Sequence, residues 1–239
     1  MIFIIFSLLA FVGLAPSIDA LELTPVEGGL SGNGSTSRYW DCCKPACAWP
    51  SNVPHSPRPV TSCKADGITP INPDAMSGCE NGTAYTCTNQ QPFIVNQTYG
   101  YGFAAAYLIG GSSTNNFCCA CFLLNFTDQI KYKHMVVQVT NSGTNFDKNE
   151  FVIALPGSGV GDHPEGCHDQ WNAPWTGWGD QYGGVHMRSE CVTLLPEELQ
   201  EGCKFRFDFM ETAANPLVSF QQVVCPDELV KISGCRIPE

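Results

Sequence analysis

One short segment, Ser37–Trp49, holds the residues best suited to proton-transfer chemistry. It places a single carboxylate, Asp41, among Tyr39, two tryptophans and three cysteines. A carboxylate can move a proton during bond cleavage, and disulfides on both sides would hold it rigidly. The flat aromatic rings suit the apolar faces of sugars, and Lys44 and Arg38 could donate to sugar hydroxyls. A Cys-rich structural knot with buried aromatic side chains explains the same composition, so the segment alone leaves both interpretations open.

A second aromatic stretch, Ala173–Gly179, contains Trp175 and Trp178 among glycine and proline. Aromatic side chains on such a loop could extend a sugar-stacking surface. Packing that anchors the loop is the alternative interpretation, and the sequence does not decide between the two.

The cysteines must position these residues. The chain has 14, an even number spread from Cys42 to Cys235, which predicts up to seven disulfides formed in an oxidising compartment. Zinc sites need paired Cys-x-x-Cys clusters with His partners, and the spacing here does not fit that pattern. We therefore expect no metal.

Two further features predict a secreted, extracellular protein. Met1–Ala20 is an apolar run that ends in small and polar residues, as a cleaved signal peptide does. Four Asn-x-Ser/Thr sequons begin at Asn33, Asn81, Asn96 and Asn125. The net charge of −11 argues against nucleic acid and anionic membrane as partners. No Gly-rich phosphate loop is present in the sequence, so no cofactor is expected.

The elements that carry the site are predicted to be mostly strands. Residues 21–34 are expected to form a flexible leader, and residues 35–239 a single domain. Glycine and proline interrupt the chain at short intervals, as an all-β barrel with short helices and long loops requires. Strands are predicted at Cys118–Phe126, His134–Thr140, Lys204–Met210 and Val218–Cys225, and short helices at Pro196–Gln200 and Pro226–Ile232.

The segment around Asp41 resembles the signature of glycoside hydrolase family 45, Ser-Thr-Arg-Tyr-Trp-Asp-Cys-Cys-Lys-Pro-Ser-Cys. The resemblance covers roughly residues 35–236, and all 14 cysteines fall on family positions. Further matching motifs are Gly78-Cys79-Glu80, Gly102-Phe103-Ala104-Ala105, Met135-Val136-Val137-Gln138, Pro156-Gly157-Ser158-Gly159-Val160-Gly161 and Tyr182-Gly183-Gly184.

The resemblance implies a six-stranded double-psi β-barrel with a long open groove that cleaves β-1,4-glucan internally, with inversion. By position it implies Asp41 as general base, Trp49 and Tyr39 as sugar contacts, and Ala105 as a residue lining the groove. It also implies the disulfides Cys42–Cys167, Cys43–Cys79, Cys47–Cys118, Cys63–Cys87, Cys119–Cys235, Cys121–Cys225 and Cys191–Cys203.

The sequence departs from the family where the general acid is expected. The family motif Asn-His-Phe-Asp corresponds here to Asn149-Glu150-Phe151-Val152, so the acid position is Val152, which carries no proton to give. The family's assisting aspartate corresponds to Asn145. Two residues could replace the acid: Glu150, on the same face of an extended strand as Val152, and Asp147, if the preceding loop is re-registered. The alternative is that Glu150 and Asp147 are ordinary solvated loop carboxylates that take no part in catalysis.

The sequence therefore predicts a secreted endo-β-1,4-glucanase, expected to be a monomer, whose partner is a β-glucan such as cellulose or xyloglucan. The alternative is a weakened or non-hydrolytic glucan-binding protein on the same scaffold, as in the expansins.

Overall fold

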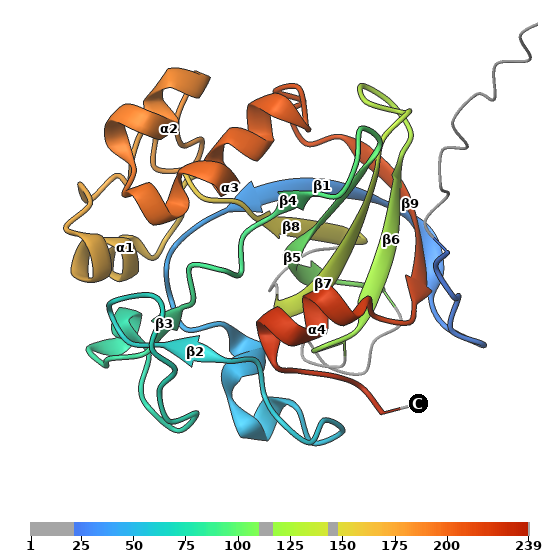
Figure 1. The fold of residues 1–239 in the computed structure, drawn as a ribbon, viewed down its shortest axis with the longest axis horizontal. Helices are drawn as coiled ribbons and strands as arrows, with labels where there is room; N and C mark the ends of the chain where they lie inside the picture. Colours follow the sequence, from blue (N-terminus) through green and yellow to red (C-terminus); the bar gives the residue numbers. More distant parts are fainter. Residues whose placement is uncertain (1–21, 110–116, 143–147, 239) are drawn as a thin grey trace, which may run out of the picture.

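The computed structural model describes residues 22–109, 117–142 and 148–238. Within these ranges the strands are β1 Ser31–Tyr39, β2 Ser62–Cys63, β3 Tyr85–Thr86, β4 Phe93–Ile94, β5 Tyr99–Tyr107, β6 Cys121–Phe126, β7 His134–Ser142, β8 Glu150–Ala154 and β9 Leu217–Val223 (Figure 1). The helices there are α1 Pro164–Trp171, α2 Arg188–Leu194, α3 Glu197–Asp208 and α4 Asp227–Ser233, with 3-10 turns at Ala46–Ala48, Pro50–Asn52 and Gly78–Glu80. The expected signal peptide, Met1–Ala20, lies outside the described residues.

Six strands close into a barrel. The main sheet runs β4-β5-β7-β6-β9-β1-β8, and β8 pairs back onto β5, which leaves only β4 outside the closed ring. β1 runs parallel to β8 and β5 parallel to β7, while the other neighbours in the ring are antiparallel. The six-stranded barrel implied by the resemblance is confirmed.

The sequence of β7 explains its position in the barrel. Its apolar residues are continuous rather than alternating, because both faces of the strand are covered. Met135, Val137 and Val139 belong to the cluster inside the barrel, whereas Val136 points into a second cluster on the outside. The buried strand expected at His134–Thr140 is thus confirmed.

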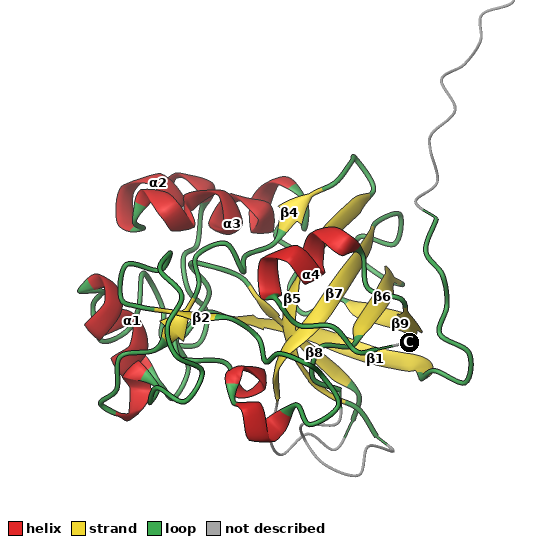
Figure 2. Ribbon diagram, turned by 60° about the horizontal axis from the view of Figure 1, so that its bottom comes forward, coloured by secondary structure: helices red, strands yellow, loops and turns green. Residues whose placement is uncertain are grey.

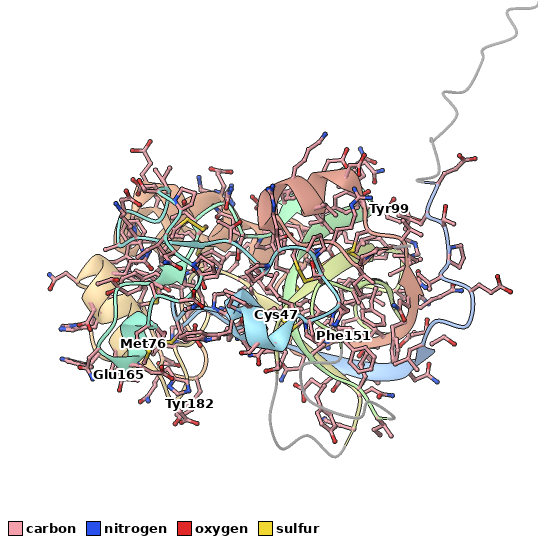
Figure 3. The ribbon with its side chains drawn as sticks, turned by 90° about the horizontal axis from the view of Figure 1, so that it is seen from below. Cys47, Met76, Tyr99, Phe151, Glu165 and Tyr182 are labelled. Atoms are coloured by element: carbon pink, nitrogen blue, oxygen red, sulfur yellow. A yellow bond between two sulfur atoms is a disulfide. The ribbon has the colours of Figure 1, made fainter. Side chains whose placement is uncertain are left out.

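Three phenylalanines fill the barrel interior. Phe122, Phe151 and Phe220 come from β6, β8 and β9, and their ring centroids lie 5.2–5.9 Å apart at edge-on or tilted angles. Figure 3 shows Phe151 among the side chains inside the barrel. Each buried phenylalanine contributes roughly 1.5–3 kcal/mol of hydrophobic free energy, so this cluster fixes β8 against the sheet.

Helices α1, α2 and α3 gather on one side of the barrel, whereas α4 packs separately across it (Figure 2). The strand expected over Lys204–Met210 is wrong, because most of this segment is the C-terminal part of α3. Phe205 and Phe209 lie four residues apart, so their rings stack 4.7 Å apart on one helical face. The alternating phenylalanines therefore fit a helical face as well as a strand.

Part of the segment expected to be a leader, residues 21–34, pairs with the barrel. Residues 31–34 form the start of β1 and pair with β9. The Val26 N–H donates to the Gln222 carbonyl, and the Gln222 N–H donates to the Leu30 carbonyl. Gly34 lets the residue before β8 approach β1 closely, since a Cβ there would lie 2.8 Å from the Asn149 carbonyl oxygen. Strand pairing uses the backbone, so a glycine- and serine-rich sequence can still form a barrel strand.

Seven disulfides are present, and no free cysteine remains. Their pairing is the one implied by the resemblance, which the cysteine spacing alone could not have given. Cys47–Cys118, Cys119–Cys235 and Cys121–Cys225 tie loops to the barrel, while Cys191–Cys203 joins α2 to α3.

Candidate active site

Asp41 lies directly after β1, at a sharply turned and cross-linked point of the chain. Tyr39, at the end of β1, accepts from the Leu155 N–H through its carbonyl (2.8 Å). Cys42 takes the left-handed conformation with φ 64°, which turns the backbone away from the barrel. Its disulfide to Cys167 and the Cys43–Cys79 disulfide then fix the turn to α1 and to the Gly78–Glu80 turn.

Helix α1 approaches this turn so closely that only glycine fits at position 166. A Cβ on Gly166 would lie 2.3 Å from the Asp41 carbonyl oxygen. The helix and the turn therefore form one rigid unit, which is the positional restraint that a catalytic carboxylate needs.

Two opposing effects act on the Asp41 carboxylate. Burial raises its pKa to about 6, while the Cys43 N–H, which donates to Asp41 Oδ1 (3.0 Å), and the nearby His163 lower it less strongly. A carboxyl group with this pKa is ionised at neutral pH and still accepts a proton readily, as a general base must. A cavity of about 10 Å³ lies beside it, lined in part by Tyr39, Gln90 and Thr140, and has room for roughly one water molecule.

Tyr39 is held next to Asp41 by a residue that sequence reasoning missed. Asn141, on β7, donates from Nδ2 to Tyr39 Oη (3.0 Å), and its Oδ1 accepts from the Ala46 N–H (2.9 Å). Burial first, and then the negative charge of Asp41, raise the pKa of Tyr39. The phenol therefore stays protonated and can donate a hydrogen bond. Asn141 follows directly after the predicted strand, and only the barrel pairing reveals its role.

Ala105 and Val152 face each other across the closing strands of the barrel. They are paired residues of β5 and β8, and Val152 is also paired with Ser37 of β1. Val152 is half-buried, whereas its neighbours Phe151 and Ile153 are buried in the core. The family's acid position therefore lies on the side of β8 that faces away from the barrel core.

Glu150 shares that side of β8. It is half-buried like Val152 and is paired with Ser35 and Tyr107, about 7 Å along the strand from Val152. The other candidate acid, Asp147, lies outside the described residues, as does Asn145.

Lys44 and Trp49 form one unit. The Lys44 ammonium donates to the carbonyl oxygens of Pro73 (2.5 Å) and Ala75 (2.8 Å) and lies 3.1 Å from the centroid of the Trp49 ring. Lys44 is 5% exposed, and burial lowers its pKa to about 8. Its contacts are thus with the Trp49 ring and the backbone, while Trp49 as a residue is half-buried.

Other kinds of site find no support in the part of the chain that the structure describes. Among these residues, no cluster of three or more His, Cys, Asp or Glu side chains could hold a metal ion. The helices there are also too short or too polar for any of them to cross a bilayer.

Comparisons with known proteins agree on one family. The profile of Glycosyl hydrolase family 45 matches residues 33–236. An endoglucanase from Phaedon cochleariae is 50% identical over 218 residues, which cover 90% of this chain and 89% of the relative. An endoglucanase from Cryptopygus antarcticus is 45% identical over 215 residues, with 89% and 93% covered. The crystal structure of a cellulase from that springtail superposes with a TM-score of 0.82 at 45% identity, covering 87% of this chain and 98% of the other.

Proposed function

The chain belongs to glycosyl hydrolase family 45 and is an endo-β-1,4-glucanase, and from this premise we propose that it cleaves its glucan by inversion with Asp41 as the general base. The observation that carries the proposal is the environment of Asp41: a rigid, cross-linked turn, a partly desolvated carboxylate with a pKa of about 6, and an adjacent protonated phenol.

In an inverting hydrolase, one carboxylate removes a proton from the attacking water while an acid protonates the leaving oxygen on the opposite face of the sugar. The two carboxyl groups stand roughly 6.5–9.5 Å apart to leave room for the water. Asp41 supplies the base. Tyr39 lies beside the reacting sugar and donates to it, and the half-buried Trp49 stacks on a more distant glucose ring.

The acid must come from a residue other than Val152. Glu150 lies on the same side of β8 and has a longer side chain than the family's aspartate, which offsets part of its displacement along the strand. Asp147 is the second candidate. We propose Glu150 as the first candidate for the general acid, because it lies on the same side of β8 as Val152.

The test measures reducing ends released from a neutral soluble cellulose derivative and from xyloglucan. Asp41→Asn is expected to lower the rate by about 10²–10⁴-fold, since it removes the base and keeps the shape. Glu150→Gln and Asp147→Asn identify the acid, because only the variant that lacks it should lose a comparable factor. Hydrolysis that survives Asp41→Asn unchanged would exclude the proposed mechanism.

One observation favours a second candidate function. Val152 cannot protonate a leaving group, so a protein without a replacement acid would bind glucan and cut it slowly or not at all. Retention on cellulose with no reducing ends released, in wild type and Asp41→Asn alike, would support this glucan-binding function.

We further propose that the protein is secreted and acts as a monomer on cellulose or xyloglucan. Seven disulfides support an oxidising compartment. Size-exclusion chromatography with light scattering would test the monomer, and reductant-free mass spectrometry of the secreted protein would test signal-peptide removal and glycan occupancy.

A further inference from the structure

A large aromatic side chain is exposed outside the site described above. Trp175 lies in the loop after α1 and is 56% exposed. Its indole stacks on the imidazole of His168, with centroids 4.1 Å apart and planes 20° from parallel. The His168 Nδ1 in turn lies 2.8 Å from the Ala173 carbonyl oxygen, which fixes the imidazole. One face of the indole is therefore covered by His168, and much of the remaining surface is open to solvent.

The loop that carries Trp175 is held in one conformation. Asn172 ends α1 in the left-handed region with φ 54°, and its N–H donates to the His168 carbonyl (2.8 Å). The Gly177 N–H closes a turn onto the Pro174 carbonyl (2.8 Å), and Gly177 has φ 75°, which favours glycine. Trp178, which is buried, anchors the end of the loop. A ring that is already fixed loses little conformational entropy when a ligand binds.

A depression of about 410 Å³ adjoins this loop, within the size range of small-molecule sites. Its lining combines indole rings with an amide and a hydroxyl group, as a sugar requires: Trp171, Asn172, Thr176, Trp178, Leu195 and Pro196. The mixture suits a ring that has apolar C–H faces and a hydroxyl rim.

The site is rigidly connected to the catalytic turn. His168 lies on α1, next to Cys167, whose disulfide partner Cys42 follows Asp41 directly. A glucan segment bound at Trp175 would therefore be held on the same rigid unit as the general base. In Figure 3, Glu165 of α1 lies toward the end of the molecule away from Phe151.

We propose that Trp175, held in place by stacking on His168, is the stacking platform of a second β-glucan-binding site. This site would hold polymeric substrate outside the cleavage site. The occupant is a β-1,4-glucan chain, because a flat, fixed indole beside a depression lined by both apolar and polar groups matches an equatorially substituted sugar ring. The net charge of −11 also disfavours acidic polymers. This inference rests on the proposed function for its substrate class.

The experiment measures retention on insoluble cellulose in the Asp41→Asn background, so that hydrolysis does not remove the ligand. Trp175→Ala is expected to weaken binding by about two- to tenfold, the size of one aromatic stacking contact. Trp175→Tyr should keep most of the binding because it retains a flat ring, whereas Trp175→Leu should behave like alanine. Thermal melting of each variant verifies folding.

Two controls are needed. One separates stacking on a sugar from non-specific apolar binding, and the other separates the second site from the proposed hydrolytic function. Ile68→Ala removes an apolar side chain of similar exposure (67%) and should leave cellulose binding unchanged. A Trp175→Leu variant that binds cellulose as well as Trp175→Tyr does would overturn the proposal, as would equal losses on cellulose and on an octyl resin. If the parent enzyme releases no reducing ends while Trp175→Ala still loses cellulose binding, the hydrolytic mechanism fails and the second site stands.

Discussion

Asp41 shows how a single side chain can be prepared for proton transfer by its surroundings. Burial favours its neutral form, whereas the Cys43 N–H and His163 favour the charged form, and burial dominates. Tyr39 responds to the same burial and to the charge of Asp41, and Asn141 holds its hydroxyl group in place. The surroundings of these side chains should therefore affect the rate of hydrolysis, the free energy of unfolding and the affinity for glucan.

The pH dependence of hydrolysis should reveal the raised pKa of Asp41. The base works as a carboxylate, so kcat/KM is expected to fall about tenfold per pH unit below pH 6 and to level off above it. The measurement uses a neutral soluble glucan, so that the substrate does not titrate. An acidic limb centred near pH 4 would mean that burial does not control this carboxylate.

The same shift predicts an effect on stability. Because the folded pKa of about 6 exceeds the ordinary 3.8, the proton bound to Asp41 stabilises the fold below about pH 4, and this contribution is lost as pH rises through 6. Asp41→Asn should therefore stabilise the protein at pH 7 by roughly 1–3 kcal/mol and have little effect at pH 3.5. Urea unfolding at both pH values checks this, and equal effects at the two values would contradict it.

Lys44 is expected to position Trp49 rather than to touch the substrate. Lys44→Met keeps the length of the side chain and removes the charge, so KM for long glucans should rise about three- to tenfold with little change in kcat. It should also destabilise the fold, because two backbone carbonyls lose their donor. Lys44→Arg, which keeps the cation, serves as the matched control. A rise in KM that is equal for both variants would contradict the role of the charge.

At the scale of the elements, strand pairing explains why part of the site could be predicted and part could not. The buried apolar run of β7 and the proline-led helix α4 follow from local sequence, and the Asp41 segment could be recognised by its motif. The parallel pairing of β1 with β8 brings Val152 beside Ser37 across more than a hundred residues, which no local pattern encodes. The contacts of Lys44 likewise depend on the Pro73–Ala75 loop, which the sequence gives no reason to place there.

The position of Val152 on β8 gives a direct test of the missing acid. Val152→Asp puts a carboxyl group on the half-exposed side of the strand, opposite Ala105, and should raise kcat by about 10²-fold or more if a general acid is lacking. Val152→Asn, of equal size but unable to donate an acidic proton, should not raise it. No gain with Val152→Asp would mean either that Glu150 or Asp147 already supplies the acid or that this side of β8 does not face the substrate. Glu150→Gln and Asp147→Asn in the same background decide between these outcomes, because one of them should abolish hydrolysis if that residue already supplies the acid.

At the scale of the whole molecule, covalent links and packing dominate over surface charge. The ion pairs of the described residues mostly involve exposed side chains, such as Arg188 with Asp208, and each contributes about 0–1 kcal/mol. The disulfides instead connect segments far apart in the sequence, and Cys42–Cys167 joins the helical side of the molecule to the end of β1.

Removing that bridge should affect stability and catalysis together. The Cys42→Ala/Cys167→Ala double variant, which opens a link between residues 125 apart, is expected to lose about 2–5 kcal/mol of unfolding free energy and most of kcat. The Cys191→Ala/Cys203→Ala variant, with a separation of 12, should lose stability and keep kcat, since it leaves the Asp41 turn intact. Equal losses of kcat in the two variants would contradict the role of the Cys42 bridge in positioning the base.

The overlap of two disulfides also bears on resistance to proteolysis. Cys42–Cys167 and Cys119–Cys235 overlap along the chain, so every peptide bond from Cys42 to Cys235 lies within the span of one or both. A protease that cuts once in this range produces two pieces that stay covalently attached. Such a nicked enzyme should migrate as a single band on a denaturing gel until reductant is added, and it can go on working after its backbone has been broken.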